Sequence, residues 1–119
     1  MYTKRMMLVI VACSLIAVSG LIAETGNREV ATFSIQAERY RFVPEVLKLP
    51  ANTPVQIQLK SRDALHGFNI PSLGIRHDLF PGQSVIVSLP ALKPGRYPFL
   101  CDIFCGSGHS SMQAEILVQ

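Results

Sequence analysis

Two cysteines, a histidine and a methionine lie within twelve residues near the end of this 119-residue chain. They are Cys101, Cys105, His109 and Met112. Thiolate and thioether donors select Cu(I), zinc or iron–sulfur clusters, whereas imidazole suits copper and zinc. Because this set holds all three kinds of donor, it indicates a soft-metal site and favours copper electron-transfer chemistry. A further ligand is expected upstream, and His66 is the candidate.

The two cysteines also have a structural interpretation. Cys13 lies in an apolar N-terminal run, which leaves Cys101 and Cys105 as the thiols of the following domain. Paired cysteines of exported proteins often form a disulfide. A bridge across three intervening residues would close a loop too small to restrain much of the unfolded chain. It would also leave His109 and Met112 unexplained, so we favour the metal site.

The rest of the chain reads as short strands. Residues 55–59 alternate apolar and polar side chains, as a half-buried strand does. The same period of two recurs in four other segments, which are residues 33–35, 85–89, 97–99 and 112–118. Turns rich in proline and glycine separate them, and no segment after residue 23 sustains a helical period. The pattern predicts an all-β sandwich of about seven strands, with residues 101–112 as a loop between two strands at one end.

The N-terminus predicts export. Two basic residues precede an apolar run from Met6 to Ala23, which as one helix would span about 27 Å, close to the thickness of a bilayer core. Basic residues before such a helix keep that end in the cytoplasm. Residues 1–23 are therefore interpreted as a membrane anchor or signal segment, and residues 24–119 as one metal-binding domain. We favour an uncleaved anchor over a cleaved signal, and both over a lipid on Cys13.

This orientation places the domain on the extracytoplasmic, periplasmic face of a bacterial or archaeal inner membrane. From residue 24 onward the chain has nine basic and eight acidic residues, so its charge is nearly balanced. Such a surface gives no sign of nucleic-acid binding. Outside residues 101–112, which we call the metal loop, the sequence offers no nucleophile paired with a base and no substrate pocket. We expect no catalytic activity of the chain on its own.

The spacing Cys-x3-Cys-x3-His-x2-Met, with His66 upstream and Gly106 after the second cysteine, resembles that of the CuA-type cupredoxins. This family includes the copper domains of cytochrome c oxidase subunit II and of nitrous-oxide reductase. Four further segments are similar to its successive strands and turns, namely residues 41–49, 55–59, 63–68 and 74–82. The resemblance implies a Greek-key sandwich after the N-terminal helix, a centre of two copper ions and single-electron transfer in a respiratory chain.

The resemblance also implies a role for each of six residues. The two thiolates would bridge the copper ions, and each histidine would bind one of them. The methionine would be a weak axial ligand, and a main-chain carbonyl between the cysteines would be the sixth ligand. In chain order these residues are His66, Cys101, Ile103, Cys105, His109 and Met112. Ligand thiols must lose their protons, so metal loading is expected to release protons.

Position 103 departs from the oxidase pattern, in which a glutamate reaches a second metal at the interface with the catalytic subunit. The chain also lacks tryptophan, which in that family forms part of the docking patch for cytochrome c. The implied partners are cytochrome c or another electron donor, and an oxidase-type catalytic subunit as acceptor. Two alternatives stay open: a mononuclear blue-copper carrier that lacks the Cys101 ligand, and a periplasmic protein that delivers copper for oxidase assembly.

Overall fold

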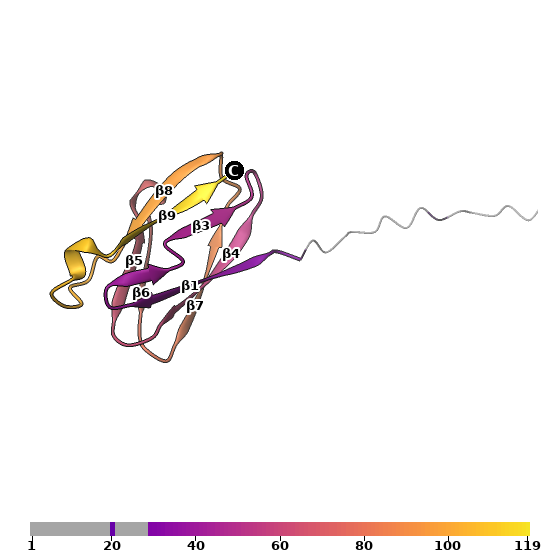
Figure 1. Cartoon of the computed structure of the whole chain (residues 1–119). Helices are drawn as coiled ribbons and strands as arrows, with labels where there is room; N and C mark the ends of the chain where they lie inside the picture. Colours follow the sequence, from indigo (N-terminus) through magenta and orange to yellow (C-terminus); the bar gives the residue numbers. More distant parts are fainter. Residues whose placement is uncertain (1–19, 21–28) are drawn as a thin grey trace, which may run out of the picture.

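Two β-sheets packed face to face make up the main body of the protein (Figure 1). The structure is a computed structural model that describes Gly20 and residues 29–119. One sheet has four strands in the order β2-β1-β4-β7, and the other has five in the order β3-β9-β8-β5-β6. The strands are β1 (Thr32–Glu38), β2 (Arg41–Val43), β3 (Val46–Leu49), β4 (Val55–Ser61), β5 (His66–Ile70), β6 (Ile75–Leu79), β7 (Ser84–Leu89), β8 (Gly95–Leu100) and β9 (Gln113–Val118). The predicted all-β sandwich is confirmed.

The predicted number of strands, about seven, is too low, because the described residues form nine. The stretch from Arg41 to Leu49 contributes two of these strands. Pro44 has no N–H to donate to a strand ladder. Accordingly, β2 ends at Val43 and pairs with β1, whereas β3 starts at Val46 and pairs with β9 in the other sheet. The chain passes from one sheet to the other at this proline.

Helical structure in residues 29–119 is limited to two short 3-10 turns, η1 (Pro71–Leu73) and η2 (His109–Ser111). Within the described part of the chain, no helix has the length and apolar character needed to cross a membrane. The N-terminal helix expected over residues 1–23 lies, apart from Gly20, outside the described residues. That expectation therefore stays a prediction.

Three phenylalanines form the centre of the core. Phe42, Phe68 and Phe99 are fully buried. The Phe99 ring centroid lies 4.9 Å from that of Phe42 and 5.0 Å from that of Phe68. Such aromatic pairs contribute about 0.5–1.5 kcal/mol each beyond the burial of their area. Because Phe68 comes two residues after His66, and Phe99 two residues before Cys101, this cluster holds the two strands that lead to the predicted ligands.

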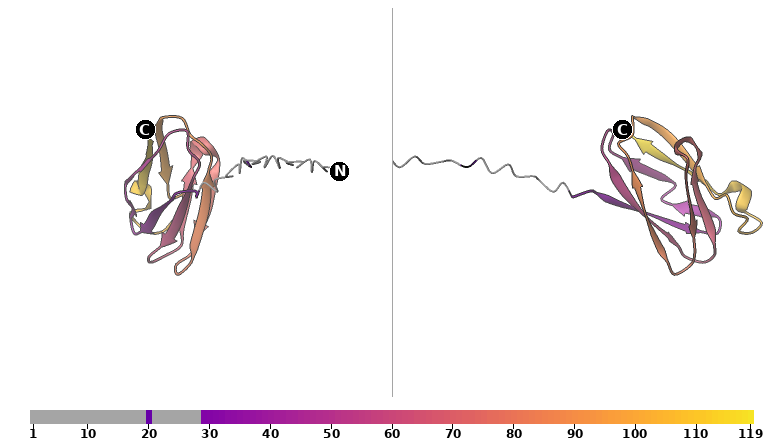
Figure 2. Two further views of the ribbon diagram at one scale, coloured as in Figure 1. Left: turned by 90° about the vertical axis from the view of Figure 1, so that its right-hand side faces the viewer. Right: turned by 180° about the vertical axis from the view of Figure 1, so that it is seen from behind.

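Residues 101–112 connect β8 to β9 and project from one end of the sandwich, away from the C-terminus (Figure 1, Figure 2). The Cys101 N–H donates a hydrogen bond to the Met112 carbonyl at 3.1 Å, which closes the base of this loop. Within the loop, His109 N–H donates to Gly106 and Met112 N–H donates to His109. The loop is therefore folded on itself at the place the alternation predicts.

Candidate metal centre

The predicted ligands lie at the strand ends on one side of the five-stranded sheet and in the loop that follows β8. His66 is the first residue of β5, and Cys101 directly follows β8, its neighbour in the same sheet. Cys105, His109 and Met112 belong to the loop that follows. The side chains of His66, Cys101, Cys105 and Met112 are all buried at the end of the core. The fold thus brings together residues that are 35 positions apart in the chain.

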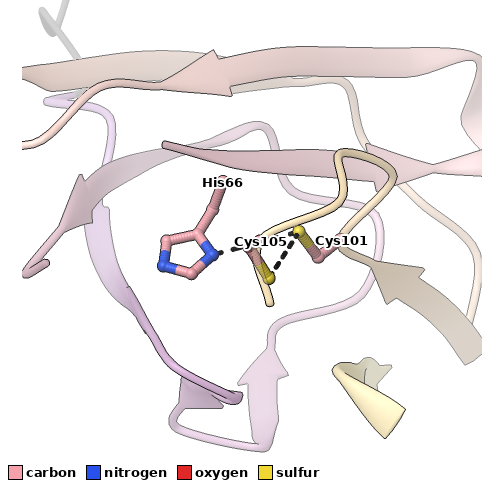
Figure 3. Close-up of side chains that lie close together, drawn as sticks. All are labelled: His66, Cys101 and Cys105. Atoms are coloured by element: carbon pink, nitrogen blue, oxygen red, sulfur yellow. Dashed lines mark hydrogen bonds between the residues drawn. The ribbon is translucent and has the colours of Figure 1, made fainter. Parts of the chain in front are cut away.

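The donor atoms of these side chains lie in contact with one another. The Cys101 and Cys105 sulfurs are 3.9 Å apart, and the Cys101 sulfur lies 3.9 Å from His66 Nδ1 (Figure 3). Among the described residues, these three side chains form a group of metal-binding type whose ligand atoms all lie within 4.8 Å of one another. A separation of 3.9 Å excludes a disulfide, in which the sulfurs are about 2.05 Å apart. Both cysteines are free thiols here.

The remaining donors adjoin this group through the two sulfurs. His109 Nδ1 lies 3.7 Å from the Cys105 sulfur, and Met112 Sδ lies 3.8 Å from it. The Ile103 carbonyl oxygen lies 3.2 Å from the Cys101 sulfur. The two imidazoles therefore contact different sulfurs, with the thiol pair between them.

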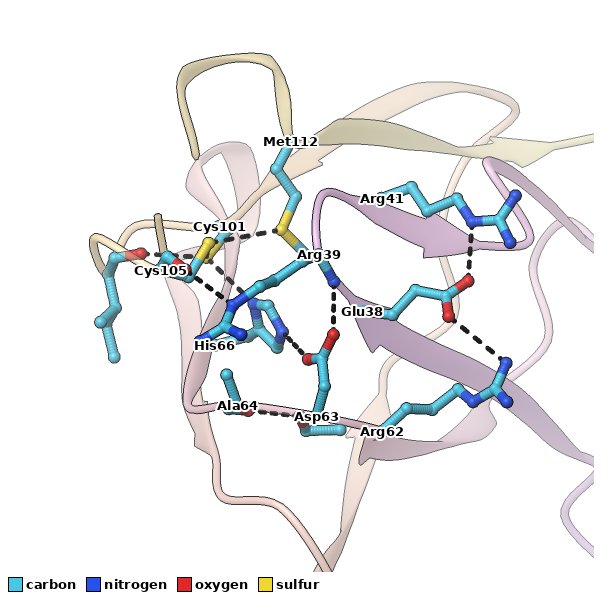
Figure 4. Close-up of polar contacts among 12 residues, drawn as sticks. Glu38, Arg39, Arg41, Arg62, Asp63, Ala64, His66, Cys101, Cys105 and Met112 are labelled. Carbon is cyan, nitrogen blue, oxygen red and sulfur yellow. Dashed lines mark hydrogen bonds and ion pairs between the residues drawn. The ribbon is translucent and has the colours of Figure 1, made fainter. Parts of the chain in front are cut away.

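Asp63 determines which nitrogen of His66 is available. His66 Nε2–H donates a hydrogen bond to Asp63 Oδ1 at 2.8 Å, so Nδ1 is left facing the Cys101 sulfur (Figure 4). Burial alone would raise the pKa of Asp63, but hydrogen bonds from the Arg39 main-chain N–H and from His66 hold it below its ordinary value. A carboxylate that fixes the orientation of a histidine in this way is typical of metal sites. Asp63 is thus placed to orient the His66 ring.

The Cys105 thiol carries its proton in the metal-free protein. Burial raises the pKa of the Cys105 thiol from 9.0 to about 11, and the neighbouring Cys101 adds to the rise. Two thiols, two imidazoles, a thioether and a carbonyl form a donor set that fits a soft metal such as copper, because the sulfurs are soft and the imidazoles suit the same ion. A metal bound here would displace the thiol protons.

Asp102 joins the loop to the neighbouring β5–β6 hairpin through side-chain contacts. Its carboxylate accepts hydrogen bonds from Arg76 on β6, at 2.5 Å from Nε and 3.1 Å from Nη2. It also packs on Gly67 of β5, where a side chain would overlap the Asp102 carboxylate. His77 lies half-buried on the same strand, β6, opposite Phe68.

Three residues near the site are not singled out by the sequence. Arg39 and Tyr40, in the turn between β1 and β2, lie against the loop. Phe104 is 79% exposed, and its ring centroid lies 5.8 Å from that of His109. An aromatic residue between two ligand cysteines, outside any alternating segment, is a signal that could have identified Phe104. No sequence signal links Arg39 to the loop, because the contact spans 66 positions.

Comparison with known proteins identifies the family to which this fold belongs. The family model described as Cupredoxin-like domain matches residues 6–118. The chain belongs to the cupredoxin-like domain family. This cupredoxin is 26% identical over 98 residues to cytochrome c oxidase subunit 2 of Thermus thermophilus, covering 82% of the chain and 72% of that relative. The predicted resemblance to oxidase subunit II is confirmed.

Solved structures agree with this assignment. The cupredoxin superposes with a TM-score of 0.68 and 28% identity on a chain of a heme-copper terminal oxidase dimer, covering 75% of this chain and 65% of that one. It superposes equally well on the periplasmic domain of cytochrome oxidase subunit II of Bradyrhizobium japonicum, with a TM-score of 0.68. That pair is 19% identical and covers 75% and 83% of the two chains, so it supports the fold alone.

Proposed function

We propose that this cupredoxin is a binuclear copper (CuA) electron-transfer protein that passes single electrons in a respiratory chain. The observation that carries the proposal is the thiol pair at 3.9 Å with one imidazole against each sulfur. A mononuclear site needs one thiolate between its histidines, whereas this arrangement offers a shared pair of sulfurs and a separate imidazole for each of two ions. The resemblance to oxidase subunit II supports the same conclusion.

The residues of the chain would hold copper as follows. Cys101 and Cys105 would supply thiolate ligands, while His66 and His109 would bind through Nδ1, the nitrogen that faces a sulfur in each case. The Met112 thioether, beside the Cys105 sulfur, and the Ile103 carbonyl, beside the Cys101 sulfur, would complete the set. Copper held in this way supplies a one-electron redox couple. Burial of His66, Cys101, Cys105 and Met112 limits access of water to these donors, and the Asp63 contact fixes the His66 ring.

The surface over the site supports contact with a redox partner. Phe104 is exposed directly beside the ligand Cys105, and its ring lies near that of the ligand His109. Exposed aromatic residues are enriched at the cores of protein interfaces. We infer that Phe104 contacts the electron donor, cytochrome c or another carrier, and that an oxidase-type catalytic subunit is the acceptor. The proposed location is the periplasmic face of the inner membrane, with residues 1–23 as the anchor.

Electron paramagnetic resonance of the copper-loaded, partly oxidised protein tests the binuclear assignment. We expect the hyperfine pattern of one electron shared by two equivalent copper nuclei, together with two copper ions per chain by elemental analysis. A spectrum from one localised copper would refute the proposal and favour the blue-copper alternative. Cys101→Ser separates the two sites further, because a blue site that uses Cys105 would survive the change and a binuclear site would not.

The copper-delivery alternative is tested by competition. A set of six donors, four of them from buried side chains, is expected to retain copper against a competing chelator while it exchanges electrons with a redox partner. Transfer of copper to a metal-free oxidase domain, without electron turnover, would instead support delivery.

A further inference from the structure

The turn between β1 and β2 lies against the metal loop and against the segment before His66. Arg39 Nε donates a hydrogen bond to the Cys105 carbonyl at 3.1 Å. The main-chain N–H of Arg39 donates to Asp63 Oδ2 at 2.8 Å, while the other oxygen of Asp63 accepts from His66 (Figure 4). One residue therefore contacts both parts of the donor set, the loop part and the β5 part.

Tyr40 extends this contact along the loop. A side chain added at Gly106 or Gly108 would overlap the Tyr40 ring, so the loop rests on that ring through its two glycines. Gly106 also has a φ of +140°, a conformation that residues with a side chain rarely adopt. The stretch between Cys105 and His109 is thus shaped to fit the β1–β2 turn.

We propose that Arg39 is a positioning residue of the metal centre, which holds the Cys105 carbonyl and the Asp63 carboxylate at a fixed separation and so joins the two halves of the ligand set. The inference rests on the proposed copper function for its purpose, but its geometry concerns the metal-free protein. Arg39 donates through both its side chain and its main chain, so a change of side chain removes only the contact with the loop.

The guanidinium has a second consequence. Its positive charge lies on the Cys105 side of the site, where the thiolates would carry negative charge. A nearby cation favours the state of the centre that holds the extra electron. Removal of this charge is therefore expected to lower the reduction potential of the copper-loaded protein, whereas a residue that served only to support the loop would have no such systematic effect.

The neighbouring Arg41 provides a matched control. It is the first residue of β2, two positions after Arg39, where it pairs with Glu38 and is 62% exposed, and it makes no hydrogen bond or ion pair with the metal loop. Arg39→Gln and Arg41→Gln remove the same charge and the same donors, the first from a position that contacts the metal loop and the second from one that pairs with Glu38 instead. Arg39→Lys keeps the charge but lacks the planar fork of donors.

Amide hydrogen exchange of the metal-free, full-length chain is the first measurement. We expect the amides of residues 105–109 to exchange about tenfold faster in Arg39→Gln, because one net hydrogen bond restrains this stretch. Arg41→Gln should match the wild type. Exchange rates for Arg39→Gln equal to those of Arg41→Gln would overturn the inference. If Arg39→Gln does not fold, Arg39→Lys is compared with the same control, and an accelerated loop supports the inference while an unchanged one overturns it.

The reduction potential of the copper-loaded protein is the second measurement. It should fall in Arg39→Gln, be restored toward the wild-type value in Arg39→Lys, and stay unchanged in Arg41→Gln. Equal potentials in all four proteins would overturn the electrostatic part of the role. A chain that binds no copper would refute the proposed function, and the exchange experiment on the metal-free protein would still decide whether Arg39 positions the loop.

Discussion

Met112 is the proposed ligand at which packing and metal binding can be separated by one substitution. Its side chain is 0% exposed, and its Sδ lies 3.8 Å from the Cys105 sulfur. Leucine has a similar volume and apolar character, and such exchanges in a core cost less than about 1.5 kcal/mol. Truncation to alanine would leave a cavity and cost about 2–5 kcal/mol. The main-chain carbonyl that receives the Cys101 hydrogen bond is unchanged in both variants.

We therefore expect Met112→Leu to unfold in urea within about 1.5 kcal/mol of the wild type when both are metal-free. In the copper-loaded protein the same variant should have a changed absorption spectrum and a raised reduction potential. Loss of a donor disfavours oxidised copper more than reduced copper, and the axial ligand tunes the potential. Urea unfolding followed by far-ultraviolet circular dichroism gives the first quantity, and a spectroelectrochemical titration gives the second.

Ile116→Leu is the matched control, because Ile116 is also 0% exposed and lies on β9, four residues after Met112. It should have a similar effect on stability and leave the spectrum and potential unchanged. A Met112→Leu protein with wild-type spectrum and potential would refute the ligand assignment. If metal-free Met112→Leu lost more than about 3 kcal/mol in its free energy of unfolding, side-chain volume alone would not account for the packing of Met112.

Three other predictions concern the residues around the donors. Asp63→Ala should weaken copper affinity by about 10–100-fold, measured by chelator competition, because it frees the His66 ring; unchanged affinity would contradict the orienting role. Phe104→Ala should leave stability within about 0.5 kcal/mol but slow electron exchange with the partner in stopped-flow experiments; equal rates would exclude the proposed contact. Because the folded Cys105 thiol has a pKa of about 11, above its ordinary 9.0, its stabilising effect is present below pH 9 and lost as the pH rises toward 11. Urea midpoints of the metal-free protein should fall over that range, and midpoints that stay level would contradict the raised pKa.

The strands and the ligand loop could be predicted because both depend on local sequence. Alternation along residues 55–59 gives the burial pattern of β4, since side chains of a strand point to opposite faces. The loop could be predicted equally well, because four donors lie at short spacings between two alternating segments. What local pattern does not specify is which sheet a short strand joins. The division of residues 41–49 between the two sheets depends on pairing with strands that are distant in sequence.

The contacts that support the proposed ligands could not be predicted from the sequence, because they too join residues that are distant in the chain. The Arg39 contact with Cys105 spans 66 positions, and the Arg76 contact with Asp102 spans 26. Arginine is a common surface residue, and nothing in its neighbours marks these two as different from Arg41 or Arg62. Their partners become adjacent only once β1, β5, β6 and the loop have been assembled.

The two halves of the donor set are held by different means. His66 begins β5 and Cys101 directly follows β8, and these two strands are neighbours in one sheet, where they pair at Asn69 and Leu100. Their approach is therefore a consequence of the core. Cys105 and His109 lie beyond the sheet, in a loop whose position depends on its closing hydrogen bond and on side chains from other elements. A centre that changes oxidation state with little movement needs both halves fixed before the metal binds. The β1–β2 turn and the Asp102–Arg76 pair would give the loop half a rigidity that the sheet alone gives only to the other half.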